Sequence, residues 1–212
     1  RGRRERHLRV ALSAPMAVVL GIRHGEVENP DHLVYARSKG FPLGPRGIAA
    51  AERLGEALRN AAVVAVWASP LERAVQTAEA LAAPHGLPVQ VDERLIEWGG
   101  LVRWQGRPWA EAMVDPDLLA MYADPVGHSP DDPLDEVGRR VMAWAGERSQ
   151  EHGDGVVLGV SHEAPLIAGW LFGRGADYSA FRSVNIPHLG GVRLLPGPPE
   201  IVDPVDALVP AC

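Results

Sequence analysis

Continuous apolar runs alternate along this chain with segments whose apolar residues recur every three or four positions. Three of the runs are bounded by polar or turn residues, a pattern typical of strands buried on both faces of a parallel sheet. These runs are AVVLGI (17–22), VVAVWA (63–68) and VVLGVS (156–161). They predict the inner strands of a central sheet.

Helical spacing of apolar residues predicts four helices between and after these strands. They are expected over 47–60, 71–83, 134–150 and 164–172. Ser69 is the predicted N-cap of the second helix, with Pro70 at its first position. The β–α–β–α order predicts an α/β fold, a three-layer α/β/α sandwich in which a mostly parallel central sheet is flanked by helices on both faces.

Elsewhere the periodicity is weaker. Residues 98–133 are expected to form an irregular insertion with one helical run at PDLLAMYA, the kind of segment that often selects the substrate. Residues 181–195 predict strand, turn and strand, and the Pro-rich tail from Pro196 is expected to be irregular. We expect a single domain over 16–212, preceded by a mobile N-terminal extension over 1–15.

Composition narrows the function classes. The 212 residues are 46% hydrophobic and 23% charged, as in ordinary soluble domains. Five Arg and one Glu fall in the first nine residues, so the remainder is more acidic than the overall charge of -6, which argues against nucleic-acid partners. Lys39 is the only lysine, which excludes a P-loop of the GxxxxGK[ST] type.

The predicted location is the cytoplasm. Cys212 is the only cysteine, so no intrachain disulfide requires an oxidising compartment. No apolar run approaches the roughly 18–20 residues of a membrane span, so no membrane partner is expected. The expected partner is a small molecule, and the oligomeric state stays open.

Polar residues follow each predicted inner strand. Arg23 and His24 come after the first strand, Arg73 lies shortly after the second, and His162 and Glu163 come after the third. Ligands bind at the carboxyl ends of the strands in an open parallel sheet. Two histidines and two arginines are therefore expected to converge at one edge of the sheet.

Four segments, in this order and spacing, resemble the signature segments of the histidine phosphatase superfamily, in its phosphoglycerate-mutase-like branch. They are RHGEVEN, ASPLERAVQTAEAL, ERLIEWGG and VSHEAPL. The resemblance spans roughly residues 16–195. It implies a metal-independent phosphatase that uses neither a metal nor another cofactor and acts on a small-molecule phosphate ester.

The resemblance also implies residue roles. His24 would be the nucleophile that forms a phosphohistidine, Arg23 and Arg73 would clamp the phosphate, and His162 would donate to a phosphate oxygen. Glu97 would protonate the leaving group and then act as base toward water, which requires a raised pKa, as expected from burial beside Trp98 or Trp104. Trp98 and Trp104 are the expected pocket walls.

The chain departs from the family pattern at several positions. Val27 stands where a Thr or Ser is usual, and Asn29, a candidate phosphate contact, comes one residue early. GGLVRWQG after Glu97 is one residue out of step with the family's GxWEG. Glu163 replaces a Gly, so it must be protonated or turned away to avoid repelling phosphate, and it is the reserve proton donor. The remaining histidines, His188 among them, are taken as surface or structural residues.

Three rival functions remain open. A phosphoglycerate-mutase-like phosphotransferase would return the phosphoryl group to a substrate hydroxyl, although the shorter chain favours hydrolysis. A non-catalytic phospholigand-binding protein would keep the fold without turnover. A metallohydrolase would use His24, His162 and a carboxylate as metal ligands, and a chelator would inactivate it.

Overall fold

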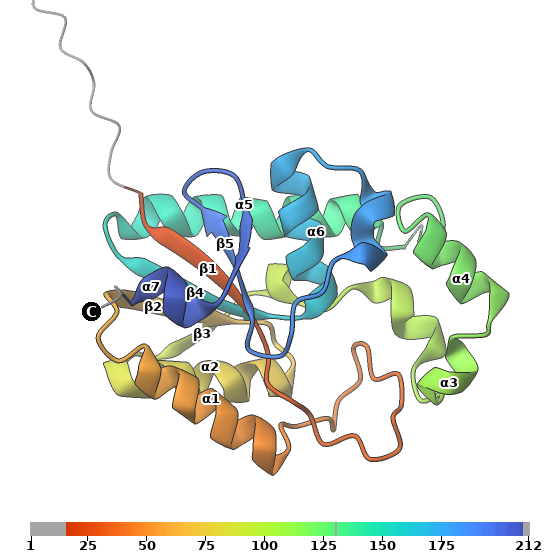
Figure 1. Ribbon diagram of the computed structural model, residues 1–212, viewed down its shortest axis with the longest axis horizontal. Coiled ribbons are helices and arrows are strands. Elements are labelled where there is room, and N and C mark those ends of the chain that lie inside the picture. Colours follow the sequence, from red (N-terminus) through yellow and green to blue (C-terminus); the bar gives the residue numbers. More distant parts are fainter. Residues whose placement is uncertain (1–15, 130, 210–212) are drawn as a thin grey trace, which may run out of the picture.

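The computed structural model describes residues 16–129 and 131–209, and the predicted extension over 1–15 lies outside these residues. A six-stranded sheet with the order β3-β2-β4-β1-β5-β6 crosses the molecule (Figure 1). Strands β3, β2, β4 and β1 run parallel, with β3 at the edge, and β5 is antiparallel to both β1 and β6. The strands are β1 Val18–Arg23, β2 Val63–Ala68, β3 Val89–Val91, β4 Val156–Ser161, β5 Gly191–Leu195 and β6 Glu200–Val202.

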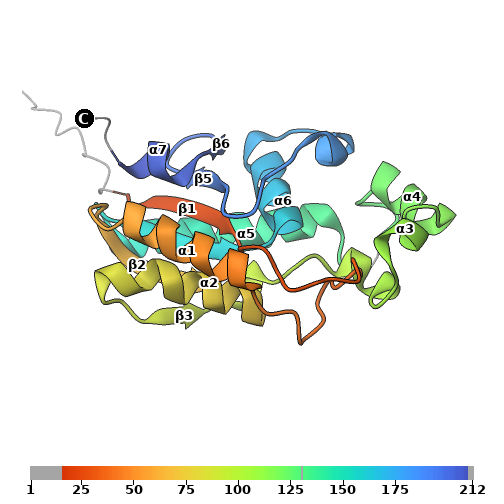
Figure 2. The same ribbon diagram turned by 60° about the horizontal axis from the view of Figure 1, so that its bottom comes forward.

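Helices cover both faces of the sheet, with α5 and α6 on one side and α1 and α2 on the other (Figures 1 and 2). This arrangement confirms the predicted three-layer α/β/α fold with a mostly parallel sheet. The α-helices are α1 Pro45–Ala57, α2 Glu72–Ala82, α3 Trp109–Ala112, α4 Pro116–Ala123, α5 Leu134–His152, α6 Glu163–Arg174 and α7 Pro204–Leu208. The 3₁₀ helices are η1 Ala83–His85, η2 Glu93–Leu95, η3 Gly99–Trp104 and η4 Tyr178–Ser183.

Two hydrophobic cores lie on opposite faces of the sheet. Successive side chains of a strand point to opposite faces, so Val19 of β1 enters the core under α5 and α6, whereas Leu20 and Ile22 enter the core under α1 and α2. All three side chains are fully buried. Burial on both faces explains why the inner strands have no polar alternation in the sequence.

Two paired glycines let α5 and α6 approach the sheet closely. Gly21 of β1 lies opposite Gly159 of β4. A Cβ on Gly21 would lie 2.5 Å from Leu166 Cδ2, and one on Gly159 would lie 2.2 Å from Cη2 of Trp144. A side chain at either position would force Leu166 or Trp144 to shift.

The inner strands and the four long helices form where the sequence predicts them, but three local predictions are wrong. Ser69 is not the N-cap of α2, because Leu71 takes that position. Residues 181–183 belong to η4, whose cap Asp177 accepts from the Ser179 N–H, so only 191–195 is a strand. The tail after Pro196 contains β6 and α7, since Asp203 caps that helix and Pro204 begins it.

The expected irregular insertion carries short elements. η3, α3 and α4 follow one another between Gly99 and Ala123, and α4 coincides with the predicted PDLLAMYA helix. They lie away from the sheet, beyond the end of α5 (Figure 1). Within the described residues, no helix has the length and apolar character that crossing a membrane requires.

Candidate active site

The register of the parallel strands brings the residues that follow them together. Arg23 at the end of β1 pairs with Ser161 at the end of β4. The His24 N–H donates to the Ser161 carbonyl over 3.0 Å, and the Ser69 N–H donates to the carbonyl of Val160 over 2.9 Å. His24, Ser69 and the residue after Ser161, His162, therefore lie at one edge of the sheet, as the sequence predicts.

His24 is held as a neutral imidazole. Its Nδ1 lies 2.7 Å from the carbonyl oxygen of Gly25, and because a carbonyl only accepts, Nδ1 carries the proton and Nε2 keeps a free lone pair. Burial lowers the pKa of His24 well below its ordinary value, and the charge of Arg73 adds to this effect. His24 is only 1% exposed, and it lines the pocket, so a ligand can reach its ring only from the pocket side.

Thr77 of α2 links the turn after β1 to Arg73. Its Oγ1 accepts from the Gly25 N–H over 3.0 Å and donates to the Arg73 carbonyl over 2.7 Å. One hydroxyl thus holds the backbone beside His24 against the first turn of the helix that carries Arg73. This fixes the position of the imidazole relative to the guanidinium.

Two guanidinium groups lie beside His24. Arg73 is buried, donates to the Ala36 carbonyl over 2.6 Å and lies 4.7 Å from the ring centroid of Tyr35. Arg23 donates to the Ile186 carbonyl over 2.6 Å. In both side chains the Nε atom is buried and has no hydrogen-bond partner within the described part of the chain.

His162 completes the set of donors. Its ring centroid lies 5.1 Å from that of His24, its Nε2 is 2.8 Å from Ser69 Oγ, and its buried Nδ1 makes no hydrogen bond to any described residue. Burial lowers its pKa well below the ordinary value, with Arg73 contributing. Buried polar atoms are normally partnered, so the unpartnered nitrogens gathered on Arg23, Arg73 and His162 are suited to an anion. Of these three residues, Arg23 is part of the cavity wall, and Arg73 and His162 lie behind it.

Glu97 supplies a buried carboxyl at the same place. Its side chain accepts from the Trp98 N–H over 2.8 Å, and Oε2 lies 3.9 Å from Nδ1 of His162. Burial raises the pKa of Glu97, and the charge of Arg73 opposes this only in part. The predicted direction of the shift is therefore confirmed, and the group keeps its proton to higher pH than an ordinary glutamate.

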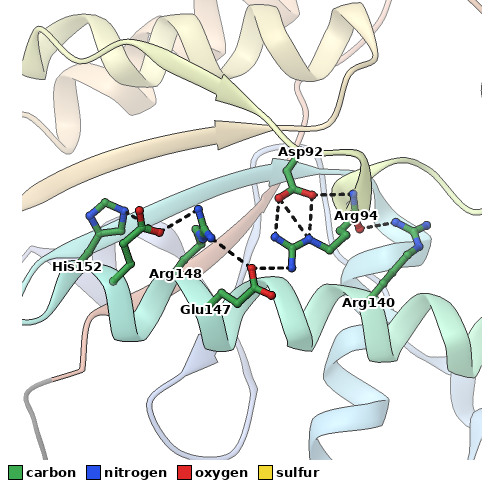
Figure 3. Close-up of polar contacts among 7 residues, drawn as sticks. Asp92, Arg94, Arg140, Glu147, Arg148 and His152 are labelled. Atoms are coloured by element: carbon green, nitrogen blue, oxygen red, sulfur yellow. Dashed lines mark hydrogen bonds and ion pairs between the residues drawn. The ribbon is translucent and has the colours of Figure 1, made fainter.

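Side chains of α5 and of the segment between β1 and α1 hold the segment around Glu97. Arg140 donates to the carbonyls of Arg94 and Ile96, the latter over 2.7 Å, and Arg37 donates to the Glu97 carbonyl, also over 2.7 Å. Figure 3 shows that the same segment also contacts α5 nearer the C-terminal end of that helix. There Arg94 pairs with Asp92 and Glu147 over 2.7 and 2.9 Å.

Glu163 and Asn29 have different positions relative to the site. Glu163 lines the pocket and forms an ion pair with Arg23, with 3.1 Å between Oε2 and Nη1. Its charge is thereby partly offset. Asn29 does not line the pocket, because its amide both donates to and accepts from the backbone of Leu33, each over 3.0 Å.

A cavity of about 360 Å³ opens in front of His24, within the usual range for small-molecule sites. Trp98 forms part of its wall, as the sequence predicts. Trp104 is buried but does not line it. The wall consists of Arg23, His24, Tyr35, Ala36, Glu97, Trp98, Leu101, Trp109, Met113, Tyr122, Glu163, Ala164, Ile167, Phe181, Arg182, Val184 and Asn185.

One histidine beside the site is missed by the sequence argument. His188 lies in the loop before β5, and its ring centroid is 5.6 Å from that of His24. Partial burial, with a contribution from Arg23, lowers its pKa to about 4. The only signal in the sequence is its place just before the apolar run GVRLL, which does not reveal that β5 lies next to β1.

A family model described as histidine phosphatase superfamily (branch 1) matches residues 19–197. The chain belongs to this family. Membership confirms the resemblance stated above and supports a phosphoric monoester hydrolase. The matched residues of this histidine phosphatase include every side chain placed around His24 in the preceding paragraphs.

The chain also resembles known proteins in sequence and in fold. The chain is 38% identical over 149 residues to Uncharacterized protein Rv0525 of Mycobacterium tuberculosis, covering 68% of this chain and 72% of that protein. YhfR of Bacillus stearothermophilus has a TM-score of 0.76 at 23% identity, with 92% of this chain and 98% of that one covered. Phosphoserine phosphatase of Entamoeba histolytica has a TM-score of 0.73 at 20% identity, with 88% and 95% covered.

Proposed function

We propose that this histidine phosphatase hydrolyses a small phosphate monoester through a phosphohistidine intermediate on His24, without a metal. The observation that carries the proposal is the hydrogen bond from His24 Nδ1 to the Gly25 carbonyl, which leaves the Nε2 lone pair free in a buried, neutral ring. A neutral imidazole is a competent nucleophile toward phosphorus.

In the first step, Nε2 of His24 attacks phosphorus and the bond from phosphorus to the ester oxygen breaks. Glu97, protonated because of its raised pKa, gives its proton to the departing oxygen. Arg23, Arg73 and His162 hold the phosphoryl oxygens through their unpartnered nitrogens. These charges and dipoles are in place before the reaction, which is how most phosphoryl-transfer catalysis works.

In the second step, the Glu97 carboxylate takes a proton from water. The water oxygen attacks phosphorus, the bond from phosphorus to Nε2 breaks, and orthophosphate leaves. Glu97 regains its proton and His24 its free lone pair, so both groups return to their starting states. Glu163 is less suited to the acid role, because its Oε2 is already engaged with Arg23 Nη1 over 3.1 Å.

The decisive experiment measures release of inorganic phosphate from p-nitrophenyl phosphate with and without EDTA. We expect turnover that EDTA leaves unchanged and that His24→Asn reduces to background. His128→Ala is the matched control, because this exposed histidine lies outside the pocket and its loss should leave turnover intact. Brief incubation with labelled substrate should trap an acid-labile phosphoenzyme that the His24 variant lacks.

Other outcomes point to the rival functions. Activity lost with EDTA would favour a metallohydrolase, although the described residues bring together no group of three His, Cys, Asp or Glu side chains suited to a metal ion. Transfer of label to an added alcohol in place of phosphate release would favour a phosphotransferase. Binding of phosphate without turnover would favour a phospholigand-binding protein. The cytoplasmic location and the single domain over 16–212 remain predictions from the sequence. The oligomeric state remains open.

A further inference from the structure

The pocket wall carries two chemically different groups of side chains. His24, Arg23, Glu97 and Glu163 form the polar group. The other group consists of large aromatic and aliphatic side chains supplied by the insertion, by α6 and by the segment around η4. They are Trp98, Leu101, Trp109, Met113, Tyr122, Ile167, Phe181 and Val184.

Three of the aromatic rings pack against one another and form a preformed surface. The ring centroid of Phe181 lies 5.6 Å from that of Trp98 in an edge arrangement and 6.2 Å from that of Tyr122 in a stacked one. Trp98 is fully buried, and its indole N–H already donates to the Asp132 carbonyl over 2.7 Å. Trp98 and Phe181 therefore offer a ligand only apolar faces and edges.

Charge at this pocket disfavours an anionic leaving group. Glu163 lines the pocket as a carboxylate, and the Arg23 charge is partly offset by its ion pair with Glu163. Arg182 is the charged side chain beside the aromatic rings within the described residues, but it is exposed and stacks 5.1 Å from the Tyr122 centroid. It belongs to the rim and not to the interior.

We infer that this enzyme prefers phosphate monoesters of bulky, uncharged, apolar alcohols, whose aromatic or branched hydrocarbon part fills the space between Trp98, Met113 and Phe181. This inference rests on the proposed function, since it assigns the leaving-group side of the same site. It makes the aromatic wall the specificity determinant. Small hydroxy acids and polyols are the disfavoured class, because their carboxylate or hydroxyl groups lose hydration there without gaining partners.

The test compares leaving groups of similar chemical reactivity, so that only recognition differs. 2-Phenylethyl phosphate, glycerol 1-phosphate and O-phosphoserine are all esters of primary aliphatic alcohols. We expect kcat/KM for the phenylethyl ester to exceed that for either of the others by about tenfold or more, as burial of a phenyl group predicts. O-Phosphoserine should be the poorest substrate, because it carries both a carboxylate and an ammonium group, and each loses hydration against an apolar wall.

Substitutions at two neighbouring positions test whether the substrate preference depends on the pocket wall. Met113→Asp places a carboxylate on the aromatic wall and should lower kcat/KM for the phenylethyl ester about tenfold while changing that for glycerol 1-phosphate little. Val114→Asp is the matched control, because Val114 is 76% exposed and lies outside the pocket. Met113→Leu should retain the preference, which separates loss of apolar character from loss of fold.

The outcomes separate this inference from the proposed function. If wild-type enzyme hydrolyses all three esters equally well, or prefers O-phosphoserine, the leaving-group assignment is wrong and the phosphatase assignment stands. An equal loss on all three esters in Met113→Asp, with Met113→Leu normal, would also overturn the assignment. If no ester is hydrolysed by wild type beyond the level of His24→Asn, the proposed function itself fails.

Discussion

Arg140 of α5 donates through Nη2 to the carbonyl of Ile96 over 2.7 Å, one residue before Glu97. The same guanidinium donates to the Arg94 carbonyl, so a single side chain from the long helix holds the C-terminal end of η2. Arg140 does not line the cavity. In the proposed mechanism its role is therefore positional, because it holds the segment that carries Glu97.

Arg140→Met should lower kcat about 10- to 100-fold while changing KM little, because a displaced acid slows the chemical step more than binding. Two carbonyls left without their donor should also destabilise the fold by about 1–3 kcal/mol. Steady-state kinetics and thermal unfolding measure the two effects. Arg139→Met on the exposed face of α5 is the control, and equal kinetic losses in both variants would contradict the positional role.

Glu97→Gln should lower activity, and its effect on stability should depend on pH. Burial raises the pKa of Glu97 above its ordinary value of 4.5, so its contribution to stability is complete below pH 4.5 and is lost as pH rises through the folded-state pKa. Gln is neutral throughout. The melting temperature of the variant minus that of wild type should therefore increase from pH 4 to pH 8. A difference that does not change with pH would argue against a raised pKa of Glu97.

Arg73→Met should shift the pH–rate profile as well as reduce the rate. Loss of a buried guanidinium beside the phosphate is expected to lower kcat/KM about 10²–10³-fold. Because the Arg73 charge lowers the pKa of Glu97, its removal should also move the alkaline limb of the profile to higher pH. A rate loss with an unmoved alkaline limb would show that Glu97 is not the acid.

Asn29→Ala should affect stability more than turnover. The amide makes two hydrogen bonds to the backbone of Leu33, so its loss should cost about 1–3 kcal/mol of the free energy of unfolding. Once folded, the variant should retain a kcat close to that of wild type. A large fall in kcat with unchanged stability would instead support the phosphate contact that the family pattern implies for Asn29.

Much of the fold was predictable from periodicity because its inner strands are buried on both faces. Val19 and Leu20 serve opposite cores, and this double burial is what produces the continuous apolar runs in the sequence. The edge of the sheet was less predictable. Neither β6 nor α7 buries enough apolar surface to leave a clear pattern, and the strand expected at 181 is a 3₁₀ helix capped by Asp177.

The convergence of His24 and His162 followed from the sequence by itself, because residues that come directly after parallel strands must meet at one edge. The tertiary structure decided the rest. It alone places Arg140 behind Glu97, His188 beside His24 and Phe181 against Trp98, since these pairs come from elements far apart in the chain. Such contacts depend on strand order and helix packing, which leave no local pattern of apolar and polar residues.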